Sequence, residues 1–158
     1  MTSQPAWMNS IDEALPDQPD EVRDAVLILN NVVKDRPATS WIDRKAVAPD
    51  VFIYVVSDQV LHRLHARIDQ QDPVDETFSS SCGQTSRALS SSDSYSFQAV
   101  RRVVPNQETR LCDWSFSVAD LQPIYVQVIR NDPATRPAGN FALTLAREID
   151  RARTSRRG

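Results

Sequence analysis

The stretch VFIYVVSDQVLHRLHARI, residues 51–68, decides the fold of this chain. Its first six residues are all β-branched or aromatic, which predicts a strand buried on both faces. Residues 60–68 allow two interpretations. Their apolar residues alternate with a period of two, as in a strand, and they also fit the stripe of a helix that Ser57 would cap. We favour the strand because the alternation continues without a break for nine residues.

Residues 19–35 predict an amphipathic helix. Pro19 suits the first helical position, acidic residues fill the first turn, and a lysine lies in the last turn. Apolar side chains recur every three or four residues, and Leu27 and Ile28 widen their stripe, which predicts burial on more than one side of the helix. An alternative for part of this segment is a strand over 25–33.

The remaining hydrophobic pattern predicts an antiparallel meander. Phe141, Leu143 and Leu145 alternate as in a closing strand, although Asn140 could instead cap a helix in the same segment. We therefore predict an α+β fold in which the N-terminal amphipathic helix packs on an antiparallel β-sheet or β-sandwich meander. The alternative is a mixed sheet with a helix at 58–70. The predicted strands lie near 51–56, 60–68, 95–104, 111–118, 124–130 and 140–147.

The composition indicates one folded domain between two charged ends. The 158 residues are 41% hydrophobic and 25% charged, which is enough to build a core. We divide the chain into a polar N-terminal arm (1–16), a single globular α+β domain (17–147) with a Ser-rich loop (70–94), and an Arg-rich C-terminal tail (148–158). Three glycines are too few for the Gly-rich phosphate cradle of Walker and Rossmann nucleotide sites.

No segment predicts membrane insertion or export. No apolar run approaches the roughly 20 residues that a membrane helix needs. The start, MTSQPAW, has neither the basic nor the apolar region of a signal peptide. We therefore expect a cytoplasmic protein without a membrane partner.

Two segments resemble a known family in their hydrophobic pattern. PDVFIYVVSDQVLHRLHARI (49–68) and PIYVQVIRNDPATRPAGNFALTL (123–145) resemble the first and closing hairpins of the bacterial pre-peptidase C-terminal family, which are small β-sandwich accessory domains. The resemblance covers about a quarter of the chain. The scarcity of glycine and the predicted helix at 19–35 depart from the family, and no functional residue is carried over from it.

The histidines and cysteines are the candidates for chemistry. His62 and His65 would share a face on a helix and could bind a metal or relay a proton there, whereas on a strand they point to opposite sides. Cys82 could act as a nucleophile with one of them as its base, or form a disulfide with Cys112. Because no third ligand or orienting group is evident, we predict no metal, no cofactor and no catalytic residue. A small cytoplasmic enzyme using Cys82 or the two histidines remains an alternative.

Opposite charges at the two ends are the most informative feature for function. Residues 1–35 carry a net charge of -5, and residues 147–158 carry +3. Such ends can steer association between proteins, and an arginine tail can also neutralise nucleic-acid phosphates. We predict a non-catalytic protein interaction or self-assembly subunit, a homo-oligomer or the partner of another protein, with a nucleic-acid-packaging coat-type protein as an alternative. The predicted contact residues are Asp12, Glu13 and Asp17 in the arm and Arg147, Arg151, Arg153, Arg156 and Arg157 in the tail.

Overall fold

The computed structural model describes residues 4–16, 18–34, 36–44, 50–68 and 80–157. The chain forms two compact units, residues 1–86 and residues 87–158, which we call unit 1 and unit 2. Each has an antiparallel sheet and helices of its own, which confirms the predicted α+β class with an N-terminal helix. The single globular domain predicted over 17–147 stays a prediction, and the units are described separately. Among the described residues, no helix is long and apolar enough to span a membrane.

Residues 50–68 form a β-hairpin in unit 1. β2 (Asp50–Ser57) pairs antiparallel with β3 (Val60–Ile68), which confirms the strand interpretation and excludes the helix at 58–70. Asp58 and Gln59 join the two strands with φ of 51° and 62°. Positive φ at both residues is the geometry of a two-residue hairpin turn whose twist matches that of the strands. The turn therefore favours the period-two interpretation over the helix cap.

Two further strands complete the sheet of unit 1. β1 (Thr39–Arg44) pairs antiparallel with β2, and the strand order is β1-β2-β3-β4, with β4 (Ser80–Ala88) at one edge. β4 corrects the Ser-rich loop predicted over 70–94, of which residues 70–79 lie outside the described residues. Most of its side chains alternate between partly buried and exposed, so an edge strand can be built with few apolar residues.

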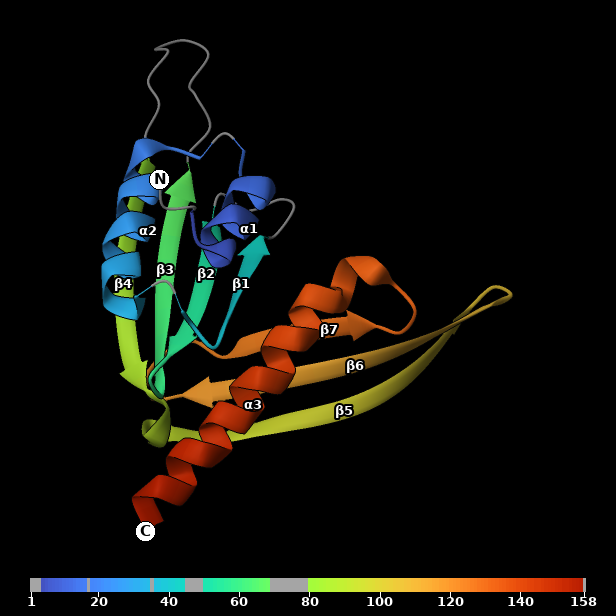
Figure 1. Ribbon diagram of the computed structural model, residues 1–158. Coiled ribbons are helices and arrows are strands. Elements are labelled where there is room, and N and C mark those ends of the chain that lie inside the picture. Colours follow the sequence, from blue (N-terminus) through green and yellow to red (C-terminus); the bar gives the residue numbers. More distant parts are fainter. Residues whose placement is uncertain (1–3, 17, 35, 45–49, 69–79, 158) are drawn as a thin grey trace. The chain divides into compact units, whose positions relative to one another are not determined.

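Helices cover one face of this sheet (Figure 1). α2 (Asp20–Val33) confirms the predicted helix and excludes the strand at 25–33. Leu27 and Ile28 are 49% and 62% exposed, so the predicted burial on more than one side is wrong. The helix packs on the sheet through a single apolar stripe, and its other sides face solvent. The buried stripe consists of Val22, Val26, Leu29 and Val33.

The predicted N-terminal arm, residues 1–16, contains a second helix, α1 (Ala6–Ala14). Trp7, Met8 and Ile11 are buried in the core of unit 1. Ile11 is four positions from Trp7 and three from Met8, which is the spacing that places side chains on one side of a helix. The arm prediction is wrong because the polar residues between these anchors form the outer face of an amphipathic helix.

Unit 2 is a three-stranded antiparallel sheet with a long helix along one face (Figure 1). β5 (Ser92–Val104), β6 (Gln107–Val118) and β7 (Ile124–Ile129) lie in that order and confirm three predicted strands. β5 and β6 form a long hairpin, and Asn106 in its turn has φ of 64°. In Figure 1 the turn end of this hairpin extends beyond the helix.

The helix of unit 2, α3 (Arg136–Arg157), corrects the prediction for the C-terminal segment. We predicted a strand over 140–147 and a loose Arg-rich tail, whereas one helix includes both. Phe141 and Leu145 are fully buried and Leu143 is 47% exposed, which fits a period of 3.6 and not a period of two. The chain therefore has no closing β-strand at 140–147. The helical alternative is correct, but α3 begins at Arg136, so Asn140 lies inside the helix and does not cap it.

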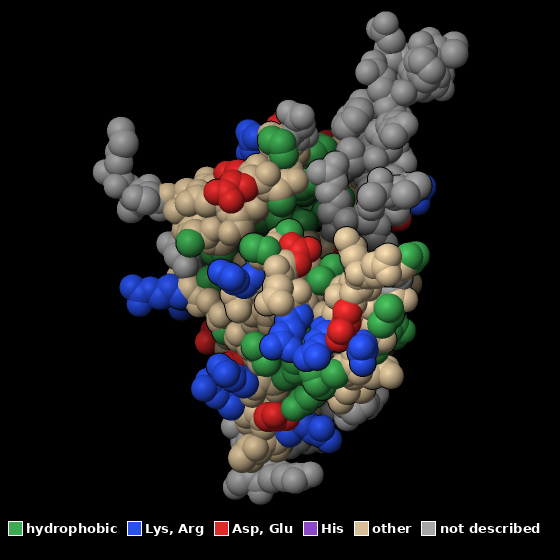
Figure 2. Space-filling view, turned by 90° about the vertical axis from the view of Figure 1, so that its right-hand side faces the viewer, with side chains coloured by type: hydrophobic (Ala, Val, Ile, Leu, Met, Phe, Trp, Pro, Cys, Tyr) green, Lys and Arg blue, Asp and Glu red, His purple; other side chains and the backbone are tan. Residues whose placement is uncertain are grey.

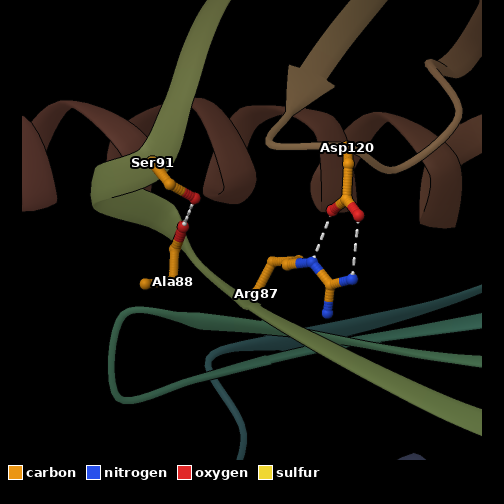
Figure 3. A network of polar contacts seen from close by, with 4 residues as sticks. All are labelled: Arg87, Ala88, Ser91 and Asp120. Carbon is orange, nitrogen blue, oxygen red and sulfur yellow. Dashed lines mark hydrogen bonds and ion pairs between the residues drawn. The ribbon is translucent and has the colours of Figure 1, made fainter.

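A forked ion pair joins Arg87, near the end of β4, to Asp120 in the turn between β6 and β7 (Figure 3). Arg87 Nε donates to Asp120 Oδ1 at 2.6 Å, and its Nη2 donates to Oδ2 at 3.2 Å. These hydrogen bonds raise the pKa of Arg87. Close by, Ser91 Oγ donates to the Ala88 carbonyl at 2.6 Å, next to a short 3₁₀ turn. Because the Asp120 side chain is 74% exposed, water screens this ion pair, and the pair contributes little to the free energy of folding.

Candidate interaction surfaces

The two histidines point to opposite faces of β3, as the strand interpretation predicts. His62 Nδ1 forms a 2.7 Å hydrogen bond with Ser86 Oγ on β4. His65 Nε2 forms a 2.8 Å hydrogen bond with Asp50 Oδ1, and its ring stacks on Phe52 at 4.5 Å between centroids. The histidines therefore take part in two separate local networks and do not form a shared site.

The cysteines are both free thiols in the structure, one in each unit. Cys82 packs against the hydrophobic core of unit 1, and this burial raises the pKa of its thiol. A raised pKa keeps the sulfur protonated near neutral pH, which is the opposite of what a nucleophile needs. Among the described residues, no three His, Cys, Asp or Glu side chains gather as a metal site would require.

The burial of His62 predicts a pH-dependent stability. Desolvation lowers the pKa of His62 from its ordinary value of 6.5, and Asp58 opposes this shift more weakly. The unfolded chain thus binds a proton more readily than the folded chain, so stability is full at neutral pH and declines as the pH falls below about 6.5. Urea midpoints at pH 7.5, 6.5 and 5.5 should show this decline, and His62→Gln should reduce it. An equal decline in His62→Gln would show that other groups cause it.

Of the three predicted acidic contact residues, two lie on the outer surface of α1. Asp12 and Glu13 are exposed, whereas Asp17 lies outside the described residues. Asp12 Oδ2 accepts a hydrogen bond from Gln4 Nε2 at 2.7 Å, so this carboxylate is engaged within its own helix region. These residues thus belong to a helix surface of unit 1 and not to an extended arm.

The outward face of α2 combines acidic and apolar side chains. Asp20 and Asp24 are exposed near its beginning, and Leu27 and Ile28 follow on the same outward side. Val32, at 52% exposure, extends the apolar part toward the end of the helix. Exposed aliphatic side chains so close together on one helix mark a candidate contact surface.

The outward face of α3 combines arginine with an exposed leucine. Leu143, Arg147 and Arg151 are exposed and follow one another at four-residue intervals, which places them on one side of the helix. Arg151 Nη1 donates to Glu148 Oε1 at 3.2 Å. Arg153 is also exposed but lies toward Tyr95. The backbone of Arg156 and Arg157 is helical, and their side chains lie outside the described residues.

The two units carry opposite net charges. Unit 1 has fourteen acidic and seven basic residues, which gives -7, and unit 2 has seven acidic and eleven basic residues, which gives +4. The sequence pattern indicates the charged ends, but the predicted contact residues include neither the outward face of α2 nor Leu143. The four-residue spacing of Asp20, Asp24 and Ile28 was the signal for the former, and the prediction that Ile28 is buried conceals it.

A second group of arginines lies at the turn end of the β5–β6 hairpin. Arg101 and Arg110 are cross-strand neighbours, whereas Arg102 points to the opposite face of the sheet. Tyr95 Oη donates to Asp150 of α3 at 3.0 Å, so the C-terminal half of α3 lies beside the other end of β5. Arg101 is six positions from Tyr95 along β5, a distance of about 20 Å. Among the described residues, the two arginine groups therefore do not form the continuous patch that nucleic-acid binding would need.

The fold matches only one of the two hairpins in the resemblance to the pre-peptidase C-terminal family. Residues 49–68 do contain a hairpin, but residues 123–145 contain β7 followed by the beginning of α3, so the second hairpin is not formed. In comparisons with known proteins, no family model, no curated protein and no solved structure matches this chain.

Proposed function

We propose that this chain is a non-catalytic subunit that associates with a second copy of itself, with α2 of one copy packed against α3 of the other. The observation that carries the proposal is the matching order of charged and apolar side chains on the two outward faces. Each face has two like charges and one aliphatic side chain, all at four-residue intervals. In matching order they are Asp20, Asp24 and Ile28 on α2, and Arg151, Arg147 and Leu143 on α3.

An antiparallel alignment of the two helices brings every member of one set opposite its counterpart. Four residues advance an α-helix by about 6 Å, so both sets repeat with the same spacing. Asp24 would then face Arg147, and Ile28 would face Leu143. Antiparallel helices also place the positive end of each helix dipole beside the negative end of the other.

The apolar and charged parts of this contact have different roles. Leu27 and Ile28, at 49% and 62% exposure, and Leu143, at 47%, would lose contact with water on association, which favours binding. The carboxylates and guanidinium groups would steer the encounter and fix the register of the helices. Arg147 is the better arginine for a test than Arg151, which already pairs with Glu148.

The alternative functions receive less support. A nucleic-acid-packaging protein would need the tail arginines and those of the β5–β6 hairpin in one patch. Asp150, which lies among the tail arginines, is bonded to Tyr95, and Tyr95 is about 20 Å along β5 from Arg101. An enzyme using Cys82 would need a thiolate and a nearby base, whereas burial raises the pKa of that thiol.

Charge reversal at the centre of the contact should dissociate the protein. Asp24→Arg and Arg147→Asp each place like charges opposite one another, and each is expected to weaken association at least tenfold, which is about 1.4 kcal/mol. The measurement is the solution mass by light scattering over a concentration series at low salt. High salt should weaken the association of the natural chain in the same direction.

Mixing the two variants distinguishes a contact between copies from one within a copy. In the mixture, the arginine introduced on α2 of one variant can meet the aspartate introduced on α3 of the other. The natural Asp24–Arg147 pair is also available, so the mass of the natural protein should return. Glu13→Arg is the matched control, because it makes the same charge change on the exposed surface of α1. The sequence predicts Glu13 as a contact residue, but the proposed α2–α3 contact does not include it. A natural chain that is monomeric at every concentration, a mixture that stays monomeric, or an equal effect of Glu13→Arg would each contradict the proposal.

A further inference from the structure

Three arginines lie side by side across the sheet of unit 2. Arg101 on β5 is directly opposite Arg110 on β6. Arg130 follows β7, and its backbone N–H donates to the Arg110 carbonyl at 2.9 Å, which continues the register by one residue. The three side chains therefore share one face of neighbouring strands. Like charges directly opposite one another destabilise a sheet, so this arginine row is costly unless an anion neutralises it.

The described residues supply only part of that neutralisation. Glu108 Oε1 lies 3.1 Å from Arg101 Nε and 3.2 Å from Arg110 Nε, so one carboxylate serves two arginines. The Arg101 and Arg110 side chains remain 68% and 60% exposed. Arg130 is also exposed and has no ion pair among the described residues. The four side chains together carry a net charge of +2.

An apolar pocket of about 470 Å³ adjoins the arginine row. Ala99, Cys112 and Val128 lie in one register row across β5, β6 and β7, two residues from the arginines, and they line the pocket together with the arginine row. A smaller, polar pocket of about 370 Å³ is lined by Arg110 and Arg130 of the arginine row together with Glu108 and Asn131. Figure 2 shows basic side chains gathered around an acidic one, with hydrophobic surface beside them.

The next register row adds an exposed aromatic surface. Phe97 is 51% exposed, and its ring lies 4.8 Å from that of Trp114 on β6. Along the strands, the arginine row is thus followed by small apolar side chains and then by an aromatic pair. Aromatic faces favour planar groups, whereas the arginine fork favours phosphate or carboxylate oxygens.

We infer that this surface binds a small organic phosphate that carries a planar apolar group, with the phosphate on Arg101, Arg110 and Arg130 and the planar group over Ala99 and Cys112. The net charge of +2 at the arginine row matches a phosphate monoester, which carries about -1.5 to -2 at neutral pH, better than it matches a single carboxylate. The arginines fix the anionic end, and the pocket selects molecules with an apolar body. No residue of this site belongs to the outward faces of α2 and α3, so the site does not use the residues of the proposed self-association contact.

Calorimetric titration of the full chain with three probes tests both parts of the site. Phenyl phosphate should bind at least tenfold more tightly than inorganic phosphate, and phenol should not bind measurably. Arg110→Gln should weaken the binding of phenyl phosphate at least tenfold. Ala99→Leu should reduce the affinity for phenyl phosphate to that for inorganic phosphate, because an exposed position on β5 tolerates a larger side chain that fills the pocket.

Arg102→Gln is the matched control, since it removes the same charge from the neighbouring position on the opposite face of β5. This variant and Arg147→Asp should both bind phenyl phosphate like the natural chain, which separates this site from the self-association contact. Equal affinities for phenyl phosphate and inorganic phosphate would show that the apolar pocket does not take part in binding. An equal loss in Arg102→Gln and Arg110→Gln, or no binding of any probe, would overturn the site as a whole.

Discussion

Replacing Phe141 by alanine is expected to lower the free energy of unfolding by about 3–5 kcal/mol. The ring is fully buried, and it lies on the side of α3 that contains the other buried residues of the helix. Truncation removes the apolar surface of the ring and leaves a cavity that the surrounding strands can only partly fill. Urea unfolding followed by far-ultraviolet circular dichroism measures the loss, at high salt so that association does not contribute.

The matched control for this prediction is Leu143→Ala on the same helix. Leu143 is 47% exposed, so its truncation should change the stability by no more than about 0.5 kcal/mol. Leu145→Ala, at a fully buried position, should cost about 2–5 kcal/mol. A large loss in Leu143→Ala would instead support the alternation of a strand, since a strand places Phe141, Leu143 and Leu145 on one face.

The contrast between β3 and α3 explains which elements the sequence could predict. Residues 60–68 alternate over nine positions, and Asp58 and Gln59 supply a hairpin turn, so pattern and turn chemistry agree. At the C-terminus, Phe141, Leu143 and Leu145 satisfy a strand over only five residues. The apolar residues of the same segment satisfy a helix over a much longer stretch, to Ala152. Because the helical pattern is much longer than the strand pattern, it is the stronger signal.

The candidate surfaces were less predictable than the fold because they depend on register between distant segments. Arg101 and Arg110 could be paired from the hairpin, but Arg130 joins them only through the pairing of β6 with β7. The sequence identifies the arginines of the outward face of α3. Leu143, Arg147 and Arg151 lie on one side, however, only when the segment is a helix. Composition thus predicted which side chains are available, and topology determines which of them act together.

Replacing Trp7 by alanine is expected to destabilise unit 1 by about 3–5 kcal/mol, whereas an N-terminal arm would tolerate the change. The ring is only 5% exposed, and its Nε1 donates a hydrogen bond to Asn30 Oδ1 on α2 at 3.1 Å. The indole therefore contributes both apolar burial and a link between the two helices of unit 1. Urea midpoints, converted to free energies with the measured slope, give the comparison.

Two further variants separate the contributions of this tryptophan. Trp7→Phe keeps most of the ring surface and loses the hydrogen bond to Asn30, so it should cost about 1–2 kcal/mol, most of it from the loss of that bond. Glu13→Ala, at an exposed position of α1, should change the stability by no more than about 0.5 kcal/mol. If Trp7→Ala were as harmless as Glu13→Ala, α1 would not belong to the core of unit 1. A loss confined to Trp7→Ala would instead show that the tryptophan acts through burial, which is how α1, a helix with many polar residues, becomes part of the core of unit 1.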